Sequence, residues 1–265
     1  MDEKWKEEYR NLLLDTTSDY PDVKKIVRQH IPSHLYKYGS FRSQYWKDVI
    51  YKAQIYLSSP VKFNDPFDCK ANFDYKLAVK SGKFRDELIT TIEEDIIEKI
   101  PDEFVQKVIE MMRKNVFVFS FSEVWNSILM WAHYADSYSG YCIEYDMNQV
   151  RGFLTENLYP VLYEKEYIDI TNSLIYTRSK PGLICHLAKA KEWEYEKEWR
   201  IIENNRKSIY FRKALKAVYL GINCSKKIEE DIVKWAENNN KEVYLTPLYN
   251  FWIKPFLRNI DIPRL

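Results

Sequence analysis

The strongest constraint on the fold is a series of short apolar and aromatic runs that recur between helical segments of unequal length. These strand-like runs lie near Leu35, Ile55, Val116, Tyr141, Trp199 and Val218. Such runs are typical of strands. Six to eight short strands mixed irregularly with helices favour an α+β fold over a doubly wound α/β fold. We therefore expect a mixed or antiparallel-rich sheet system with flanking helices.

The helical periodicity divides the chain into parts. Residues 1–34 predict an N-terminal helical segment, and residues 35–265 predict a single α+β domain. Within this domain, residues from about 77 to 114 change to a charged, amphipathic pattern that Pro101 splits. This change indicates a helical insertion.

Individual helices have recognisable ends. The run NSILMWAHYAD predicts a helix whose start Asn126 would cap, and Ser225 would cap the helix over SKKIEEDIVKWAENNN. Residues 173–191 predict a helix that Pro181 interrupts.

The charge balance excludes some partners. The 40 Lys and Arg residues nearly cancel the 39 Asp and Glu residues, which leaves a net charge of +1. Such a chain has no bulk electrostatic attraction to nucleic acid or to an anionic membrane. No run approaches the roughly 18 apolar residues of a membrane span, and the opening MDEKWKEEYR is too charged for a secretory signal. We therefore expect a cytoplasmic protein without a membrane partner.

Two common classes of cofactor site are absent from the sequence pattern. The chain has six glycines, where average usage predicts about 18, and none forms GxGxxG or GxxxxGKS. Rossmann dehydrogenases and P-loop enzymes are therefore not expected. The four cysteines and four histidines show no CxxC, no HxxxH and no clustering with carboxylates. We predict no metal site and interpret the cysteines as small core residues.

Four segments place polar groups inside otherwise apolar runs, where burial costs free energy unless the groups are paired or used. The first segment is LYKYGS. In this segment Lys37 and Tyr38 end a predicted strand, and Arg42 lies just beyond. A lysine here is also typical of a solvated edge strand.

The second segment is the predicted loop SSPVKFNDPFD. Its polar residues include Ser58, Ser59 and Asp65, and one of its two aromatic residues is Phe67. Loops of this kind often line sites, although the same side chains also cap turns.

The third segment runs from FSFSE to GYCIEYD. Ser120 and Ser122 share a face of the predicted strand, and His133 and Tyr134 lie on the predicted helix. His133 and Asp136 would share one face of that helix. A lone histidine among aromatic residues is also typical of a hydrogen-bonded core.

The fourth segment is WEYEKEWRII. Glu194, Glu196 and Glu198 recur at period two, so in a strand they would point the same way, together with Arg200. A row of like carboxylates is repulsive unless a cationic or hydroxyl group lies against it. A solvated strand face is the alternative interpretation.

At these four segments the sequence resembles a bacterial family of unknown function, DUF2971. The matching motifs are LYKYGSF, IYLSSPVKFNDPFD, FSFSE with ILMWAHYADSYSGYCIEYD, and EKEWRII with KAVYLGI. They occur in the expected order over most of residues 35–222.

In outline the order of segments is also similar to that of ADP-ribosyltransferases, which have small α+β folds. LYKY resembles their first strand, with Lys37 where that family has histidine or arginine. Either Ser58–Ser59 or the pair Ser120 and Ser122 would be their middle motif, and Glu196–Glu198 matches their ExE motif. The resemblance implies an ADP-ribosyltransferase-like enzyme that uses NAD. It also implies a toxin or phage-defence effector that acts on a macromolecule or a small acceptor.

The resemblance further implies roles for single residues. Glu198 would stabilise the oxocarbenium-like transition state that forms as nicotinamide leaves ribose, with Glu196 and His133 as further catalytic candidates. The candidates for binding the dinucleotide are Lys37, Tyr38, Arg42, Ser58, Ser59, Phe67, Ser120, Ser122, Tyr134 and Arg200. The change Glu198→Gln should then remove activity with little loss of stability, because it deletes charge rather than packing.

The residues alone leave two other classes of function open. One is a hydrolase or nuclease that uses His133 with the carboxylates of Asp65 and Glu198. The other is a non-enzymatic module that binds another protein through a surface rich in the 21 tyrosines. Convergence of Lys37, the Ser58 loop, His133 and Glu198 in one cleft would favour an enzyme, and their scatter would favour the module.

Overall fold

Helices and short strands alternate irregularly along the chain. The computed structural model describes residues 4–18, 20–81, 110, 113–114, 116–150, 153–177, 180–204, 206–246, 248–249, 252–253 and 256–257. The helices are α1 (Lys4–Leu14), α2 (Tyr20–His30), α3 (Trp46–Tyr51), α4 (Tyr75–Lys80), α7 (Ile128–Tyr134), α8 (Phe153–Glu156), α9 (Thr171–Tyr176), α10 (Lys180–Leu187) and α11 (Lys226–Asn239). Short 3-10 helices are η1 (Pro60–Lys62), η2 (Met147–Gln149) and η3 (Lys191–Glu196).

The strands are β1 (His34–Gly39), β2 (Gln54–Tyr56), β3 (Phe117–Ser122), β4 (Tyr141–Asp146), β5 (Leu158–Pro160), β6 (Leu162–Glu164), β7 (Ala188–Ala190), β8 (Glu198–Glu203), β9 (Ser208–Tyr210), β10 (Leu215–Gly221), β11 (Glu242–Thr246), β12 (Leu248–Tyr249), β13 (Trp252–Ile253) and β14 (Phe256–Leu257).

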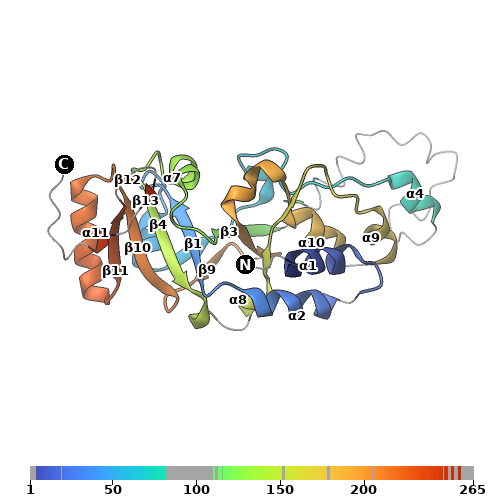
Figure 1. The fold of residues 1–265 in the computed structure, drawn as a ribbon, viewed down its shortest axis with the longest axis horizontal. Helices are drawn as coiled ribbons and strands as arrows, with labels where there is room; N and C mark the ends of the chain where they lie inside the picture. The colour runs from blue at the N-terminus through green and yellow to red at the C-terminus, as the bar shows by residue number, and fades with distance from the viewer. Residues whose placement is uncertain are drawn as a thin grey trace.

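An eight-stranded sheet in the order β14-β11-β10-β4-β1-β3-β8-β5 runs along the molecule (Figure 1). Strands β10 and β11 pair in parallel, joined by α11, because a parallel pair needs a crossover connection. The other neighbours in this sheet pair antiparallel. The prediction of an α+β fold with a mixed, antiparallel-rich sheet system is confirmed.

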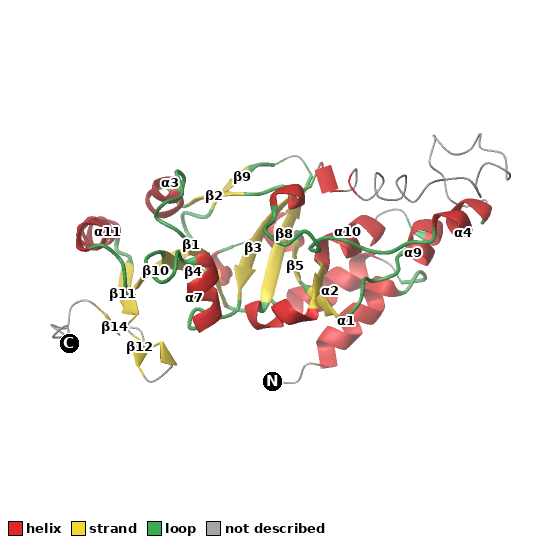
Figure 2. Ribbon diagram, turned by 90° about the horizontal axis from the view of Figure 1, so that it is seen from above, coloured by secondary structure: helices red, strands yellow, loops and turns green. Residues whose placement is uncertain are grey.

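The two faces of the sheet differ in what they bury. One face carries Leu35, Phe121, Ile143 and Trp199, which belong to the main apolar core together with residues of α1, α2, α3, α10 and α11. Figure 2 shows α3 and α11 on one side of the strands and α7 on the other. The main core therefore lies on the side away from α7.

The second face, toward α7, changes character along the sheet. Tyr38 packs against the fully buried Trp131 in a smaller apolar cluster. Tyr36, two residues before Tyr38 and so on the same face, pairs with Ser122, which pairs with Glu198. The face is thus aromatic over β1 and β10, with Cys142 and Glu144 of β4 between them, and polar over β3 and β8.

The N-terminal helices α1 and α2 form where the sequence predicts helices. Tyr9 of α1 is buried and donates its hydroxyl to the carbonyl of Pro160 in β5 at 3.1 Å. The ring of Trp5 lies 6.2 Å from that of Trp199 in β8. These helices therefore pack against the β8–β5 end of the sheet.

The predicted ends of α7 were wrong. Ser127, not Asn126, is the N-cap, and its hydroxyl accepts a hydrogen bond from the N–H of Met130. Asn126 lies one residue too early to reach these amide groups. The helix ends at Tyr134, and Asp136 has a φ of 50°, so His133 and Asp136 do not share a helical face.

The single helix predicted over residues 173–191 was also wrong. This region contains most of α9, then α10, and then the strand β7, which pairs in parallel with β6. Pro181 lies in the first turn of α10, where its missing N–H is tolerated. The cap at Ser225 is confirmed, because its hydroxyl accepts from the N–H of Ile228.

Of the insertion predicted over residues 77–114, the described part is helical in α4 and at residues 110, 113 and 114, and the remainder lies outside the described residues. Within the part of the chain that the structure describes, no helix is long and apolar enough to cross a membrane.

Candidate functional site

Lys189 on β7 is the centre of a buried group of charged side chains. Its ammonium donates to Glu196 Oε2 and, at 2.8 Å, to Glu198 Oε2, and it lies 3.7 Å from Asp68 Oδ2. Each of these side chains is at most 7% exposed. Together with Arg200 they form what we call the charged cluster, which consists of Asp68, Lys189, Glu196, Glu198 and Arg200.

Arg200 holds Glu198 in one orientation. Its guanidinium is fully buried and donates to Glu198 Oε1 at 2.8 Å and to Glu198 Oε2 at 3.0 Å. The same group donates to Asp68 Oδ2 at 2.8 Å and to the His186 carbonyl at 2.7 Å. Such a bidentate pair fixes both the distance and the plane of the carboxylate.

A left-handed turn brings the two glutamates to the same ammonium. Glu196 ends η3, Glu198 begins β8, and Lys197 between them has a φ of 45°. Glu194 lies in η3 and is exposed. The prediction of three glutamates on one strand face was therefore wrong, because the strand starts only at Glu198.

The pKa values of Glu196 and Glu198 are shifted in opposite directions. Burial raises the pKa of Glu196, and the Lys189 ammonium only partly offsets this. Burial acts the same way on Glu198, but the charges of Arg200 and Lys189 outweigh it and lower the pKa of that carboxyl. At neutral pH, Glu198 is therefore the firmly ionised member of the pair, and Glu196 holds a proton more readily.

One other predicted site residue reaches this region, and a second lies behind it. Tyr134 on α7 donates its hydroxyl to Glu196 Oε1 at 2.6 Å. Lys37 is on the opposite face of β1 from Tyr36, the residue that shares a sheet face with Glu198, and it donates to the Ser120 carbonyl at 2.9 Å. Burial lowers the pKa of Lys37, and the negative charges of Glu198 and Glu196 act against this. Lys37 therefore interacts with the cluster through its charge alone.

The predicted loop reaches the cluster through residues other than its serines. Asp68 binds Arg200, and the ring of Phe63 lies 5.6 Å from the guanidinium carbon of Arg200. Ser58 is exposed, and Ser59 donates to a backbone carbonyl at 3.3 Å. From this loop, Asp68 contacts the cluster. Lys37, Ser58 and His133 do not line the pocket that Glu198 lines, so the predicted convergence of these residues in one cleft was wrong.

Three predicted residues have partners outside the cluster. Arg42 pairs with Asp136 at 2.9 Å, and its side chain is 83% exposed. Tyr38 is buried and donates to a backbone carbonyl at 2.9 Å. His133 is exposed, and its Nδ1 lies 3.0 Å from the Tyr195 hydroxyl.

The remaining predicted residues support the backbone or face solvent. Ser122 donates its hydroxyl to the Glu196 carbonyl at 2.6 Å, and Ser120 offers its carbonyl to Lys37. Phe67 is 62% exposed, in a turn where Asp65 Oδ1 accepts from the Phe67 N–H at 2.8 Å.

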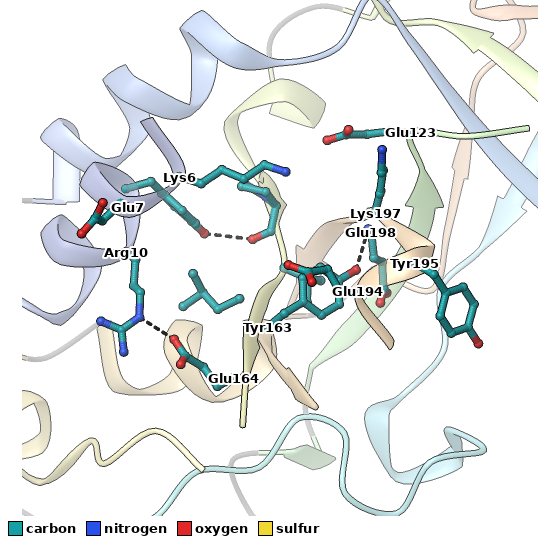
Figure 3. A pocket seen from close by; sticks show the side chains of 14 residues that line it. Lys6, Glu7, Arg10, Glu123, Tyr163, Glu164, Glu194, Tyr195, Lys197 and Glu198 are labelled. Atoms are coloured by element: carbon teal, nitrogen blue, oxygen red, sulfur yellow. Dashed lines mark hydrogen bonds and ion pairs between the residues drawn. The ribbon is translucent and has the colours of Figure 1, made fainter. Parts of the chain in front are cut away.

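A pocket of about 600 Å³ opens beside Glu198 (Figure 3). Lys6 and Arg10 of α1 line one side, and Lys197 and Glu198 line the other. Figure 3 shows the Tyr195 ring turned away from the cavity. The volume is in the range of small-molecule sites.

Sequence reasoning missed two residues of this site. Lys189 falls inside the predicted helix, although a lysine in the apolar run LICHLAKAK carries the same signal of a polar group in an apolar run. Tyr163, whose hydroxyl accepts from the Glu198 N–H at 2.8 Å, is one of 21 tyrosines and has no distinguishing context.

Comparison with known families gives one result. Residues 130–201 match the family described as "Protein of unknown function (DUF2971)". The DUF2971 match spans α7 to the middle of β8 and contains every member of the charged cluster except Asp68. A search of curated proteins found no match, and neither did a search of solved structures. Among the described residues, no group of three or more His, Cys, Asp or Glu is arranged to hold a metal ion.

Proposed function

We propose that the chain cleaves the bond between nicotinamide and ribose in NAD and transfers the ADP-ribosyl group to an acceptor. The observation that carries this proposal is the pair Glu196 and Glu198. They are two neighbouring buried carboxylates with opposite pKa shifts, beside a pocket of ligand size. Carboxylates whose environments push their pKa values apart are suited to different roles in cleaving a glycosidic bond.

Glu198 suits the role of the fixed anion. As the bond from the ribose C1′ to nicotinamide breaks, its electron pair leaves with nicotinamide, and positive charge develops on the ribose ring. An ionised carboxylate stabilises that charge, or accepts from a ribose hydroxyl. Glu198 Oε1 accepts one hydrogen bond from Arg200, which leaves this oxygen an acceptor position for substrate.

Glu196 suits proton transfer. The acceptor nucleophile must lose a proton as it bonds to C1′, and a carboxylate with a raised pKa is the better base. Tyr134 and Lys189 each hold one oxygen of Glu196. They would keep it oriented during the transfer.

The pyrophosphate needs cations on the pocket wall. Lys6 and Lys197 line the same pocket as Glu198 and fill this need. Arg42, the sequence-based candidate, pairs with Asp136 instead. We therefore assign the phosphate contacts to Lys6 and Lys197.

The test is release of nicotinamide from labelled NAD, with cell extract as the source of acceptor. We expect release by the unchanged chain, and a loss of about a hundredfold or more for Glu198→Gln and for Glu196→Gln. Glu192→Gln is the matched control, because Glu192 lies in η3, is exposed and does not line the pocket. It should keep the full rate. No release by the unchanged chain, or equal rates for Glu192→Gln and Glu198→Gln, would refute the proposal.

The structure changes one expectation about Glu198→Gln. Both oxygens of Glu198 accept from buried cations, so its loss removes charge-assisted hydrogen bonds. Each such bond contributes on the order of 1.5–3 kcal/mol. Rates must therefore be compared below the melting transition of each variant. Lys6→Ala, which changes a half-buried side chain on the α1 side of the pocket rather than the cluster, is the second variant and should weaken NAD binding without unfolding.

The hydrolase or nuclease alternative has less geometric support. His133 contacts Tyr195, and Asp65 caps a turn, so neither is bound to Glu198. The role as a toxin or phage-defence effector rests on the ADP-ribosyltransferase resemblance and belongs to the same proposal. Label transferred to an extract component would identify the acceptor.

A further inference from the structure

A second pocket, of about 460 Å³, lies between the loop before α4 and the segment after β6. Lys189 lines this pocket, whereas Glu198, to which Lys189 is bound, lines the first pocket. The two pockets therefore lie against different members of the charged cluster. The residues that argue for a ligand here are Phe67, Lys70, Asn72, Lys165, Tyr167 and Ala190.

Phe67 presents an aromatic ring to solvent from a fixed turn. The Asp65 carboxylate accepts from the N–H of Phe67 at 2.8 Å, and the Asp65 carbonyl accepts from the N–H of Asp68 at 3.3 Å. The Asp68 side chain is buried, and its carboxylate accepts a hydrogen bond from Arg200. A ring that is 62% exposed on so well anchored a turn offers a preformed surface for stacking.

Asn72 and Tyr167 line the same pocket, and Asn72 pairs through its backbone with the residues that follow Tyr167. The Asn72 N–H donates to the Ile168 carbonyl at 2.9 Å, and the Asn72 carbonyl accepts from Ile170 at 2.9 Å. Tyr167 is 39% exposed, and the Asn72 side chain is exposed as well. A side-chain amide offers one donor and one acceptor side by side, which matches the edge of a nucleobase.

Small side chains and lysines line the rest of this second pocket. Ala188 and Ala190 of β7 have small side chains, which leave the floor hollow. Lys70 and Lys165 line the same pocket and supply positive charge, beside the carboxylates of Glu164 and Glu166. The Lys70 ammonium lies 5.7 Å from the centre of the Phe67 ring. Stacking rings, an amide and lysines together fit a planar base that carries a phosphate.

We propose that this second pocket binds a nucleotide, with its base stacked on Phe67 or Tyr167, its edge contacted by Asn72, and its phosphate by Lys70 or Lys165. The site adjoins the pocket assigned to NAD, because Glu164 lines both pockets, but the other lining residues differ. It does not depend on the proposed reaction.

The experiment is calorimetric titration of the full chain with AMP and, separately, with ribose 5-phosphate. We expect AMP to bind and ribose 5-phosphate to bind at least about tenfold more weakly, because the base supplies the stacking. Equal affinities would overturn the proposal, since the base would then contribute nothing. Absence of AMP binding would overturn it as well. A short oligoadenylate distinguishes a free nucleotide from single-stranded nucleic acid as the source of the base.

Variants locate the site. Phe67→Ala should weaken AMP binding about tenfold, and Ala190→Leu should do so by filling the floor. Tyr210→Ala is the matched control, because Tyr210 on β9 is 61% exposed and does not line the pocket. Lys197→Ala, in the first pocket, should leave AMP affinity unchanged. If Lys197→Ala weakens AMP binding and Phe67→Ala does not, the nucleotide occupies the first pocket, and the inference is wrong.

The two proposals fail separately. A chain that binds AMP through Phe67 but releases no nicotinamide retains the nucleotide site and loses the proposed reaction. A chain that releases nicotinamide but binds AMP independently of Phe67 retains the reaction and loses the second site.

Discussion

The α7 side of the sheet has an aromatic half and a charged half, and they bury polar groups in different ways. Over β4 and β10, Glu144 is the buried carboxylate, held by the Tyr219 hydroxyl at 2.6 Å and by Lys216 at 2.8 Å. Tyr219 in turn stacks between Trp125 and Tyr244, with ring centroids 5.1 and 4.9 Å away. The aromatic half thus surrounds one acid with apolar surface.

The charged half contains the charged cluster, in which three carboxylates contact two cations. Asp68, Glu196 and Glu198 all contact Lys189 or Arg200, and Asp68 Oδ1 is buried with no hydrogen-bond partner among the described residues. Buried ion pairs are often no more stabilising than well-packed apolar groups of similar size. The fold alone therefore does not require this arrangement.

The largest effect that we expect is from removing the cation of the charged half. Arg200→Met leaves Glu198 and Asp68 buried without their main partner. Breaking a buried pair in this way costs about 3–5 kcal/mol of unfolding free energy. Urea unfolding followed by circular dichroism measures it. A loss below about 1 kcal/mol would mean that the charged half is solvated and resembles the surface rather than the core.

A smaller effect is expected in the aromatic half. Tyr219→Phe keeps the ring stack and removes only the hydroxyl that donates to Glu144. Lys216 still holds the carboxylate, so we expect a loss of about 2 kcal/mol in the same unfolding assay. A loss equal to that of Arg200→Met would remove the distinction between the two halves.

Sequence patterns predicted these strands well, because the alternation of apolar and aromatic residues is a local property. The runs LYKYGS, NVFVFSFSE, GYCIEYD and KAVYLGI became β1, β3, β4 and β10 within a residue or two. The pairing order of the sheet depends on contacts between distant segments. No local pattern carries that information.

The site was predicted only in part, for a related reason. Glu196 and Glu198 stood out because two acids lie in an apolar run, but their geometry depends on the left-handed turn at Lys197. Nothing in KEWEYEKEW separates a 3-10 helix from a strand. Lys189 lies near these acids in sequence, but its contact with Asp68 joins segments that are far apart in the chain.

The smallest effect that we expect is on how the free energy of unfolding depends on pH. Glu196 and Glu198 should change this dependence with opposite sign. The pKa of Glu198 is lowered on folding, so its contribution to stability is present above its ordinary value of 4.5 and is lost as the pH falls below it. The pKa of Glu196 is raised, so its contribution is present below 4.5 and is lost as the pH rises.

Unfolding free energies from pH 3.5 to 6 check this sign, because this range lies on either side of the ordinary glutamate value of 4.5. With rising pH, Glu198→Gln should lose stability relative to the unchanged chain, and Glu196→Gln should gain it. Each difference should change by no more than about 1.4 kcal/mol per pH unit. Slopes of the same sign for both buried glutamates would contradict the assignment.

The most direct test of the central claim is a carbon-13 NMR titration of the side-chain carboxyls of Glu196 and Glu198 in the folded protein. The account predicts that Glu196 titrates above the ordinary value of 4.5 and that Glu198 stays ionised below it. Two carboxyls that titrate together near the ordinary value would contradict the account. So would a Glu198 that takes up its proton before Glu196 as the pH is lowered.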